Sequence, residues 1–228
     1  MTAALSCTRM PPRKSNKQPE REPAALPHFE DLEPAGAAAM LSGETIRDAR
    51  LTEGDLSSKP LPKSRMFSSV VEKVSFSEAV FSAARWDDVQ FSNCDFSNCV
   101  FHSLEAQRVE FIDCRMTGVK TSGCTLHDVL FEGCDLKYAV LREASLTTCE
   151  FTSNQMGDAD LAAVRAENCL FRQCSLSGAD LSRSVWRECD LRGAAIERII
   201  IDGAGLRTCT ITASQAIELA VLMGLRIG

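Results

Sequence analysis

The hydrophobic positions of this chain recur at every fifth residue, a period that fits neither a helix nor a strand. The series, here called the frame, starts at Ile46 and runs without insertion to Ile211, which makes 34 positions. Of these, 31 are Ile, Leu, Met, Val, Phe or Trp, and the other three are Ala106, Thr121 and Ala166. A helix repeats every ~3.6 residues and a half-buried strand every ~2, so the pattern indicates another architecture.

Small side chains form a second series, two residues before most positions of the frame. From Ala79 on it holds mainly Ala, Val and Cys, as at Cys94, Val109 and Cys134. A unit of this length cannot bury its own apolar pair, so successive units must stack on one another. The sequence therefore predicts a solenoid in which each unit supplies one short side and one corner.

The spacing of the phenylalanines predicts four sides in each coil. Residues that stack in neighbouring coils should be alike, and nine of the eleven Phe lie in the frame. Six pairs of them lie four units apart, against three pairs at each separation of one, two or three units. Eight to nine coils spaced by ~4.8 Å would make a rod ~40 Å long. One internal ladder is then expected from Phe91, Phe111, Phe131, Phe151 and Phe171.

Several units share a short consensus. They are Ala159-Asp160-Leu161, Ala179-Asp180-Leu181, Cys94-Asp95-Phe96, Cys134-Asp135-Leu136 and Cys189-Asp190-Leu191. These units resemble the pentapeptide-repeat family, whose consensus is Ala-(Asp/Asn)-Leu followed by any two residues. The resemblance covers about Ile46 to Ile211. It implies an all-β solenoid, a right-handed quadrilateral parallel β-helix, and the hand agrees with the general preference of parallel crossovers.

Glycine and proline refine the expected coils. Glycine recurs at one corner position, as at Gly118 and Gly178, where a turn with positive φ suits it. Leu61 lies in frame between two prolines, which cannot donate to a strand ladder. Regular coils are therefore expected to begin only near Met66, within a repeat region assigned to residues 41–211.

The N-terminal segment has a different composition. Residues 1–40 hold six of the eight prolines and no apolar periodicity, which predicts a disordered tail. A short helix around Phe29 to Leu41 is the alternative. No run approaches the ~18 apolar residues of a membrane span, and the stretch 1–17 lacks the apolar core of a signal peptide. We therefore expect a cytoplasmic protein without a membrane segment.

Residues 212–228 return to a helical pattern. Thr212 and Gln215 have capping-box spacing, and Gly224 is placed to end the helix, which would cover the open end of the solenoid. Its apolar side chains spread over more than one face: Ile217, Leu219, Ala220, Leu222, Met223, Leu225 and Ile227. The surplus predicts a homodimer joined at the C-terminal ends, as in several members of the family that the chain resembles.

The cysteines and histidines do not indicate an enzyme. Ten of the eleven cysteines, all except Cys7, occupy the small inward position, and their spacings are multiples of five, with no Cys-x-x-Cys. We interpret them as small buried thiols, which suits a reducing compartment. His28, His102 and His127 are too scattered for a metal site. Neither a phosphate-binding glycine loop nor a Ser/His/Asp arrangement occurs, so we expect no catalytic residue, cofactor or metal.

Charge is the one feature of composition that points to a partner. Residues 41–180 hold 21 acidic and 14 basic side chains, whereas residues 181–228 hold 5 and 6. The expected acidic surface includes Asp88, Asp95, Asp128, Asp135, Asp160 and Asp180. The resemblance implies one interpretation, because the best-known family members bind DNA gyrase and protect it from quinolones: an acidic rod that imitates DNA.

An ordinary solvated surface is the competing interpretation. Arg108 lies one predicted coil from both Asp88 and Asp128, and Arg115 lies likewise between Asp95 and Asp135. This alternation predicts salt bridges between coils, each of which would contribute little stability. Three functions remain open. The first is a rigid scaffold for an unknown protein partner, without direct binding to nucleic acid or membrane. The second is a DNA mimic that binds a type II topoisomerase, and the third is a secreted effector with a disordered leader.

Overall fold

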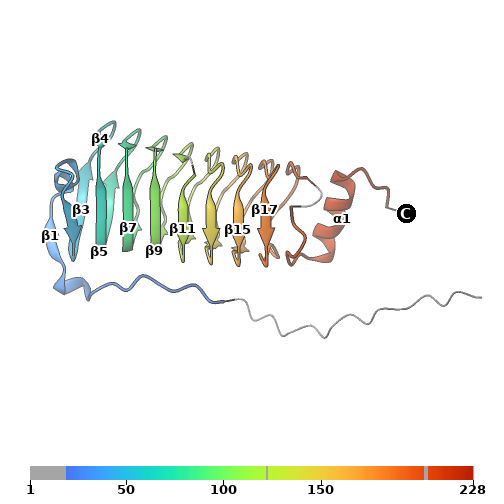
Figure 1. The fold of residues 1–228 in the computed structure, drawn as a ribbon, viewed down its shortest axis with the longest axis horizontal. Helices are drawn as coiled ribbons and strands as arrows, with labels where there is room; N and C mark the ends of the chain where they lie inside the picture. Colours follow the sequence, from blue (N-terminus) through green and yellow to red (C-terminus); the bar gives the residue numbers. More distant parts are fainter. Residues whose placement is uncertain (1–18, 122, 203–204, 228) are drawn as a thin grey trace, which may run out of the picture.

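The computed structural model of the chain describes residues 19–121, 123–202 and 205–227 (Figure 1). Parallel strands stack there into a β-solenoid of about 8 turns that ends in one short helix, the fold class that the sequence predicts. No helix in this part of the chain is long and apolar enough to span a membrane.

The strands pair in parallel, and most pairs join residues 20 positions apart, as Phe91 joins Phe111. The described residues form a 13-stranded and a 4-stranded sheet. The larger sheet contains β1 Glu33–Ala35, β2 Thr45–Arg47, β3 Ala49–Asp55, β5 Ser64–Ser75, β7 Ala84–Ser92, β9 Leu104–Ile112, β11 Thr125–His127, β12 Leu130–Glu132, β13 Ser145–Thr147, β14 Glu150–Thr152, β15 Arg165–Glu167, β16 Leu170–Arg172 and β17 Val185–Arg187. The smaller sheet contains β4 Pro60–Leu61, β6 Val80–Phe81, β8 Val100–Phe101 and β10 Lys120–Thr121.

Each coil has four sides, which we number by the frame residues of one coil. Trp86 lies on the first side, Phe91 on the second, Phe96 on the third and Phe101 on the fourth, and all four are buried. Strands of the larger sheet form the first and second sides, and β5, β7 and β9 continue from one to the other. The smaller sheet lies on the fourth side, and isolated parallel bridges join the coils on the third.

The corners use the left-handed region of backbone conformation. Gly118 and Gly178 adopt positive φ of 67° and 77°, as expected, but Asp88 and Arg108 occupy equivalent corners at 55° and 48°. Glycine is therefore not required at every corner, and Asp, Asn and other side chains accept the modest cost of this conformation. At Gly118, Gly133 and Gly178 a Cβ atom would also lie too close to the end of a side chain one coil earlier, such as the carboxylate of Asp113 beside Gly133, and that side chain would have to move.

The core is a set of side-chain ladders parallel to the rod axis. On the second side the rings stack nearly parallel, with centroid separations of 5.2, 5.0, 4.9 and 4.6 Å along Phe91, Phe111, Phe131, Phe151 and Phe171. These separations match the spacing of neighbouring strands, about 4.8 Å. The same geometry that pairs the backbones therefore also stacks the rings.

The expected disordered tail is wrong for residues 29–41. Short 3-10 helices at Phe29–Asp31 and Ala37–Leu41 flank β1, which pairs with β3. Leu32, Ala37 and Met40 are buried, and the last two belong to the apolar cluster of the coils, so this segment covers the apolar end of the first coil. The alternative helix is thus divided in two by a strand. Residues 1–18 lie outside the described residues.

Regular coils begin earlier than Met66. The strand β2 starts at Thr45, and Leu51 and Leu61 are fully buried. Pro60 pairs with Val80 in β4, the edge strand of the smaller sheet, where no preceding strand needs its missing N–H. Proline is tolerated for this reason, and the frame continues through it.

The helix α1, Ala213–Leu222, follows the last coil. Its capping box has the predicted partners: the backbone N–H of Thr212 donates to Gln215 Oε1 at 2.8 Å, and the N–H of Gln215 donates to Thr212 Oγ1 at 3.2 Å. Gly224 beyond its end has a φ of 80°. The rod is therefore covered at both ends, by residues 29–41 and by α1 (Figure 1).

Replacing Phe131 by alanine tests the ladder. Phe131 is 3% exposed and stacks on a ring on either side, so Phe131→Ala leaves a cavity that costs about 3–5 kcal/mol of unfolding free energy. Chemical denaturation measures this value. Glu132→Ala, at the exposed neighbouring position, is the control and should change it by less than ~0.5 kcal/mol. Equal effects of the two substitutions would contradict the ladder.

Candidate interaction surfaces

The cysteines pack the corners of the coils. Nine of the ten described thiols are buried, and Cys209 is partly exposed. Cys114 Sγ donates to the carbonyl of Phe91 at 3.5 Å, and an equivalent bond joins Cys134 Sγ to Phe111 at 3.3 Å. Asn154, one coil further on, makes the same bond with Nδ2. A small side chain with a weak donor therefore suits this position.

These thiols are not arranged for metal or redox chemistry. Among the described residues, no three His, Cys, Asp or Glu side chains gather as a metal site requires. Burial raises the pKa of Cys99 to about 12. The hydrogen bond with Cys134 is the largest cause that raises the pKa of Cys114 to about 12. The thiolate, which is the reactive form, is disfavoured at both positions.

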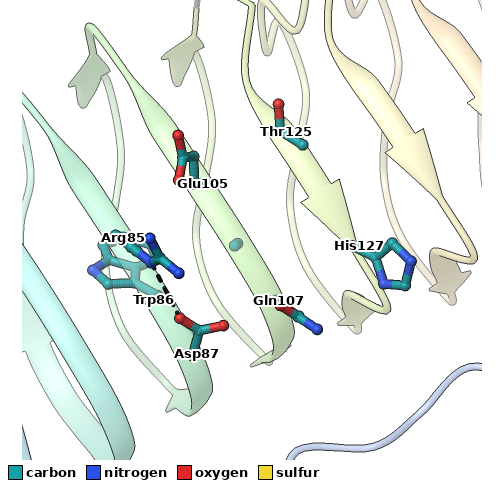
Figure 2. Close-up of a pocket in the computed structure, with 8 residues that line it drawn as sticks. Arg85, Trp86, Asp87, Glu105, Gln107, Thr125 and His127 are labelled. Carbon is teal, nitrogen blue, oxygen red and sulfur yellow. Dashed lines mark hydrogen bonds and ion pairs between the residues drawn. The ribbon is translucent and has the colours of Figure 1, made fainter.

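Shallow hollows lie along the first side. One of about 210 Å³ is lined by Arg85, Trp86, Asp87, Glu105, Ala106, Gln107, Thr125 and His127. Figure 2 shows Arg85 and Asp87 joined across 3.4 Å, with Glu105 and His127 on the next two strands. A second hollow of about 270 Å³ lies further along the same side and is lined by residues of β13, β15 and β17. Open hollows with mixed charges suit the side chains of a protein partner better than an enclosed small molecule.

Four of the aspartates expected on the acidic surface close corners instead. Their Oδ1 atoms accept the backbone N–H two residues further on, at 2.8 Å for Asp95, 3.2 Å for Asp135, 3.0 Å for Asp160 and 2.8 Å for Asp180. This contact is an Asx turn. Among the described residues Arg115 pairs with neither Asp95 nor Asp135, which corrects the predicted ladder. Both carboxylates are turned to the corner amides.

Asp88 and Asp128 lie at the corner between the first and second sides. Arg108 donates from Nε and Nη2 to the two oxygens of Asp88, at 2.7 and 2.8 Å. Asp128 pairs instead with His127, whose Nδ1 lies 2.7 Å from Oδ2. The predicted alternation therefore produces an ion pair across one coil step and not across the next.

The second side carries the acidic surplus of the rod. Outward positions lie directly before and after each frame residue. On this side, between residues 70 and 152, they hold Glu72, Glu110, Glu132 and Glu150 and no basic side chain. The nearest basic side chain further along, Arg172, reaches back to Glu150 at 3.2 Å. Sequence reasoning missed these glutamates because it counted charge over long stretches of the chain, residues 41–180 and 181–228, rather than by side.

The C-terminal helix covers the last coil with only part of its surface. Gln215 is 5% exposed, and its Nε2 donates to the carbonyls of Leu191 and Ala194 at 2.7 Å each. Leu219 packs against the core. The other predicted interface residues face outward, with exposures of 53% for Ile217, 42% for Leu222, 59% for Met223, 60% for Leu225 and 53% for Ile227.

The chain matches sequence profiles of known repeats. A profile of a pentapeptide repeat region matches residues 84–161 and 104–181, and a profile of eight pentapeptide repeats matches residues 169–206. No protein with a curated description matches the chain.

Solved structures also match. Full-length QnrB1, a plasmid-mediated fluoroquinolone resistance protein, is 20% identical, covers 85% of this chain and 95% of its own, and has a TM-score of 0.46. A trypsin-treated form of QnrB1 is 23% identical, covers 82% of this chain and 91% of its own, and has a TM-score of 0.49. HetL is a pentapeptide repeat protein involved in heterocyst differentiation regulation, from the cyanobacterium Nostoc sp. strain PCC 7120. It is 17% identical, covers 73% of this chain and 89% of its own, and has a TM-score of 0.32.

Thiol titration tests the role of the cysteines. In the folded chain at pH 8, a disulfide reagent should leave the nine buried thiols unmodified, because they are inaccessible, and should react slowly at Cys209. In denaturant all eleven cysteines of the sequence should react. Mass spectrometry locates each adduct, and Cys209→Ala should remove the slow phase. Rapid native modification between Cys94 and Cys189 would contradict the packing role.

Proposed function

This chain belongs to the pentapeptide-repeat family, and we propose that it is a rigid, non-enzymatic scaffold that pairs with a second copy of itself through α1. The exposed apolar side chains of α1 carry the proposal. Other side chains of α1 already cover the last coil, yet side chains such as Val221 and Met223 are more than half exposed. Several exposed apolar side chains on one short element are typical of an interaction site.

A second copy is the partner that the charges favour. The C-terminal residues 181–228 hold 5 acidic and 6 basic side chains, whereas residues 41–180 carry an excess of seven acidic ones, from 21 against 14. Two copies that meet at the C-terminal ends therefore avoid the repulsion that two acidic second sides would meet. A two-fold axis through this end makes the interface self-complementary.

The sides of the rod are free for protein partners in such a dimer. The first side offers hollows lined by alternating charges, as at Arg85 and Asp87, which favour polar contacts with another protein. All ten described cysteines are unpaired, which supports a reducing, cytoplasmic location. The secreted interpretation depended on a disordered leader, and residues 1–18 lie outside the described residues.

The mass of the full-length chain in solution tests the dimer. Light scattering at micromolar concentration should give twice the chain mass of 24.9 kDa. Val221→Glu with Met223→Glu should return the mass to that of one chain with unchanged thermal unfolding of the coils, because both side chains are exposed in the single chain. Ala213→Glu, also exposed on α1, is the control and should remain dimeric. A wild-type monomer would refute the proposal.

The acidic second side favours one second candidate, a DNA mimic that binds DNA gyrase or another type II topoisomerase. Its support is the row of glutamates between residues 70 and 152 without a basic outward position. A protein that accepts a duplex would meet negative charge there on four of the five coils of this stretch.

A supercoiling assay with gyrase and a quinolone tests this candidate. The wild-type chain should preserve supercoiling in the presence of the drug, and Glu72→Gln with Glu132→Gln should weaken that protection at least ~10-fold, since both carboxylates point outward from the second side. Ser92→Gln, at an outward position of the same side, is the control. No protection by the wild-type chain would eliminate the DNA mimic and leave the scaffold.

A further inference from the structure

An extended segment of the chain lies along the outside of the rod. Residues 19–28, which we call the strap, leave the covered N-terminal end and run back beside the coils towards the other end (Figure 1). They contain no helix or strand. The strap follows the corner between the first and second sides, where Asp88, Glu110 and Asp128 come from three successive coils. These three carboxylates are the acidic corner.

The strap donates backbone hydrogen bonds to each carboxylate of the acidic corner. Ala25 N–H donates to Asp88 Oδ1 at 2.8 Å, Ala24 N–H to Glu110 Oε1 at 3.3 Å, and Glu22 N–H to Asp128 Oδ1 at 3.3 Å. The side chain of Arg21 adds an ion pair, with Nη2 at 3.1 Å from Glu110 Oε1. Arg21 and Glu110 are each 13% exposed as side chains, so this pair is largely removed from water.

The register of these contacts follows from two repeat distances. Asp88 and Asp128 are two coils apart, which is ~9.6 Å at ~4.8 Å per coil. Their donors, Ala25 and Glu22, are three positions apart, which is ~10 Å in an extended chain at ~3.3 Å per residue. An extended peptide parallel to the rod axis therefore presents its amides in step with the carboxylates. The match does not depend on the side chains of the peptide.

The acidic corner is held in place by residues of the rod itself. Arg108 grips both oxygens of Asp88, and Gln90 Nε2 donates to Glu110 Oε2 at 3.0 Å. Asp128 is 4% exposed and bonded to His127. The Arg108 guanidinium, followed by the amide of the strap, holds the pKa of Asp88 below its ordinary value, so its charge persists at neutral pH. All of these supporting bonds come from the coils and none from the strap, and such preorganisation favours binding.

The strap is built for reversible attachment. Among the described residues, none from 21 to 27 makes a backbone–backbone hydrogen bond with a coil, so no sheet has to be broken to release this part of the strap. Pro19, Pro23 and Pro27 recur at every fourth position and restrict the strap to extended conformations. Docking therefore orders few backbone torsions and costs little conformational entropy.

We propose that the acidic corner is a binding site for an extended, arginine-bearing segment of a partner protein, and that the strap occupies this site in cis until the partner displaces it. The strap shows the chemistry that the site accepts: three backbone amides within four residues, those of Glu22, Ala24 and Ala25, and one guanidinium. A partner segment with the same pattern and more basic side chains meets the same carboxylates. The site belongs to the side of the rod and does not depend on α1.

Protease access to Arg21 tests whether the strap rests on the corner. Ala24→Pro with Ala25→Pro removes two of the three amide donors from the full-length chain and is compatible with an extended backbone. Ala24→Val with Ala25→Val keeps both donors and is the control. Trypsin cleavage after Arg21, followed by mass spectrometry, should be at least ~10-fold faster in the proline variant than in the wild type or the control. Equal rates in all three would overturn the strap.

A peptide added in trans tests the binding site. A fluorescent peptide with the sequence of residues 19–28 is titrated into the full-length wild type and the proline variant, with binding followed by anisotropy. It should bind the proline variant at least ~10-fold more tightly, because the site is open there. Asp88→Asn with Glu110→Gln in the proline variant should abolish binding while the circular dichroism of the coils is kept. Equal binding to the wild type and the proline variant, or binding to neither, would refute the proposal that the acidic corner binds a segment of a partner protein.

Discussion

The register between neighbouring coils, which pairs each residue with the one four units further on, is the constraint on which this structure depends. Parallel pairing at that register places like side chains on one another, so the stacked rings of Phe111 and Phe131 repeat the spacing of their backbones. It also places every corner over a corner, which is why the left-handed positions and the buried thiols form columns of their own. Strand pairing, ring stacking and corner geometry are therefore one requirement, and a residue that violates it affects the coil on either side.

The interior could be predicted from the sequence, because the register between coils requires like side chains at regular intervals and the sequence shows them. The frame and the recurrence of phenylalanine at every fourth unit were sufficient for the coils and the ladder. The N-terminal cover was missed because Ala37 and Met40 lie off the frame, although they are buried in the same apolar cluster as the coils. Pro60 was misjudged for a related reason, since only the assembled sheet reveals that β4 is an edge.

The surface was harder to predict. Counting charge cannot distinguish Asp135, which accepts a corner amide, from a glutamate on the second side that points outward. The position of the strap could not be predicted from the sequence. Its contacts join residues 63 to 106 positions apart, and they use backbone amides, which nearly every residue has. Only the even spacing of its prolines distinguished it. Interior and surface thus carry separate information, and the frame constrains only the first.

Because each coil has four sides, the number of repeat units before a residue determines the side on which that residue lies. Removal of one repeat unit would leave every inward side chain in frame, yet it would turn all that follows by a quarter of a revolution. The row of glutamates on the second side would then continue on another side beyond that point, and α1 would emerge with a different azimuth. Removal of a whole coil would shorten the rod by one step and preserve every alignment. Changes in chain length can therefore redirect the outer surfaces of such a protein while its core stays the same.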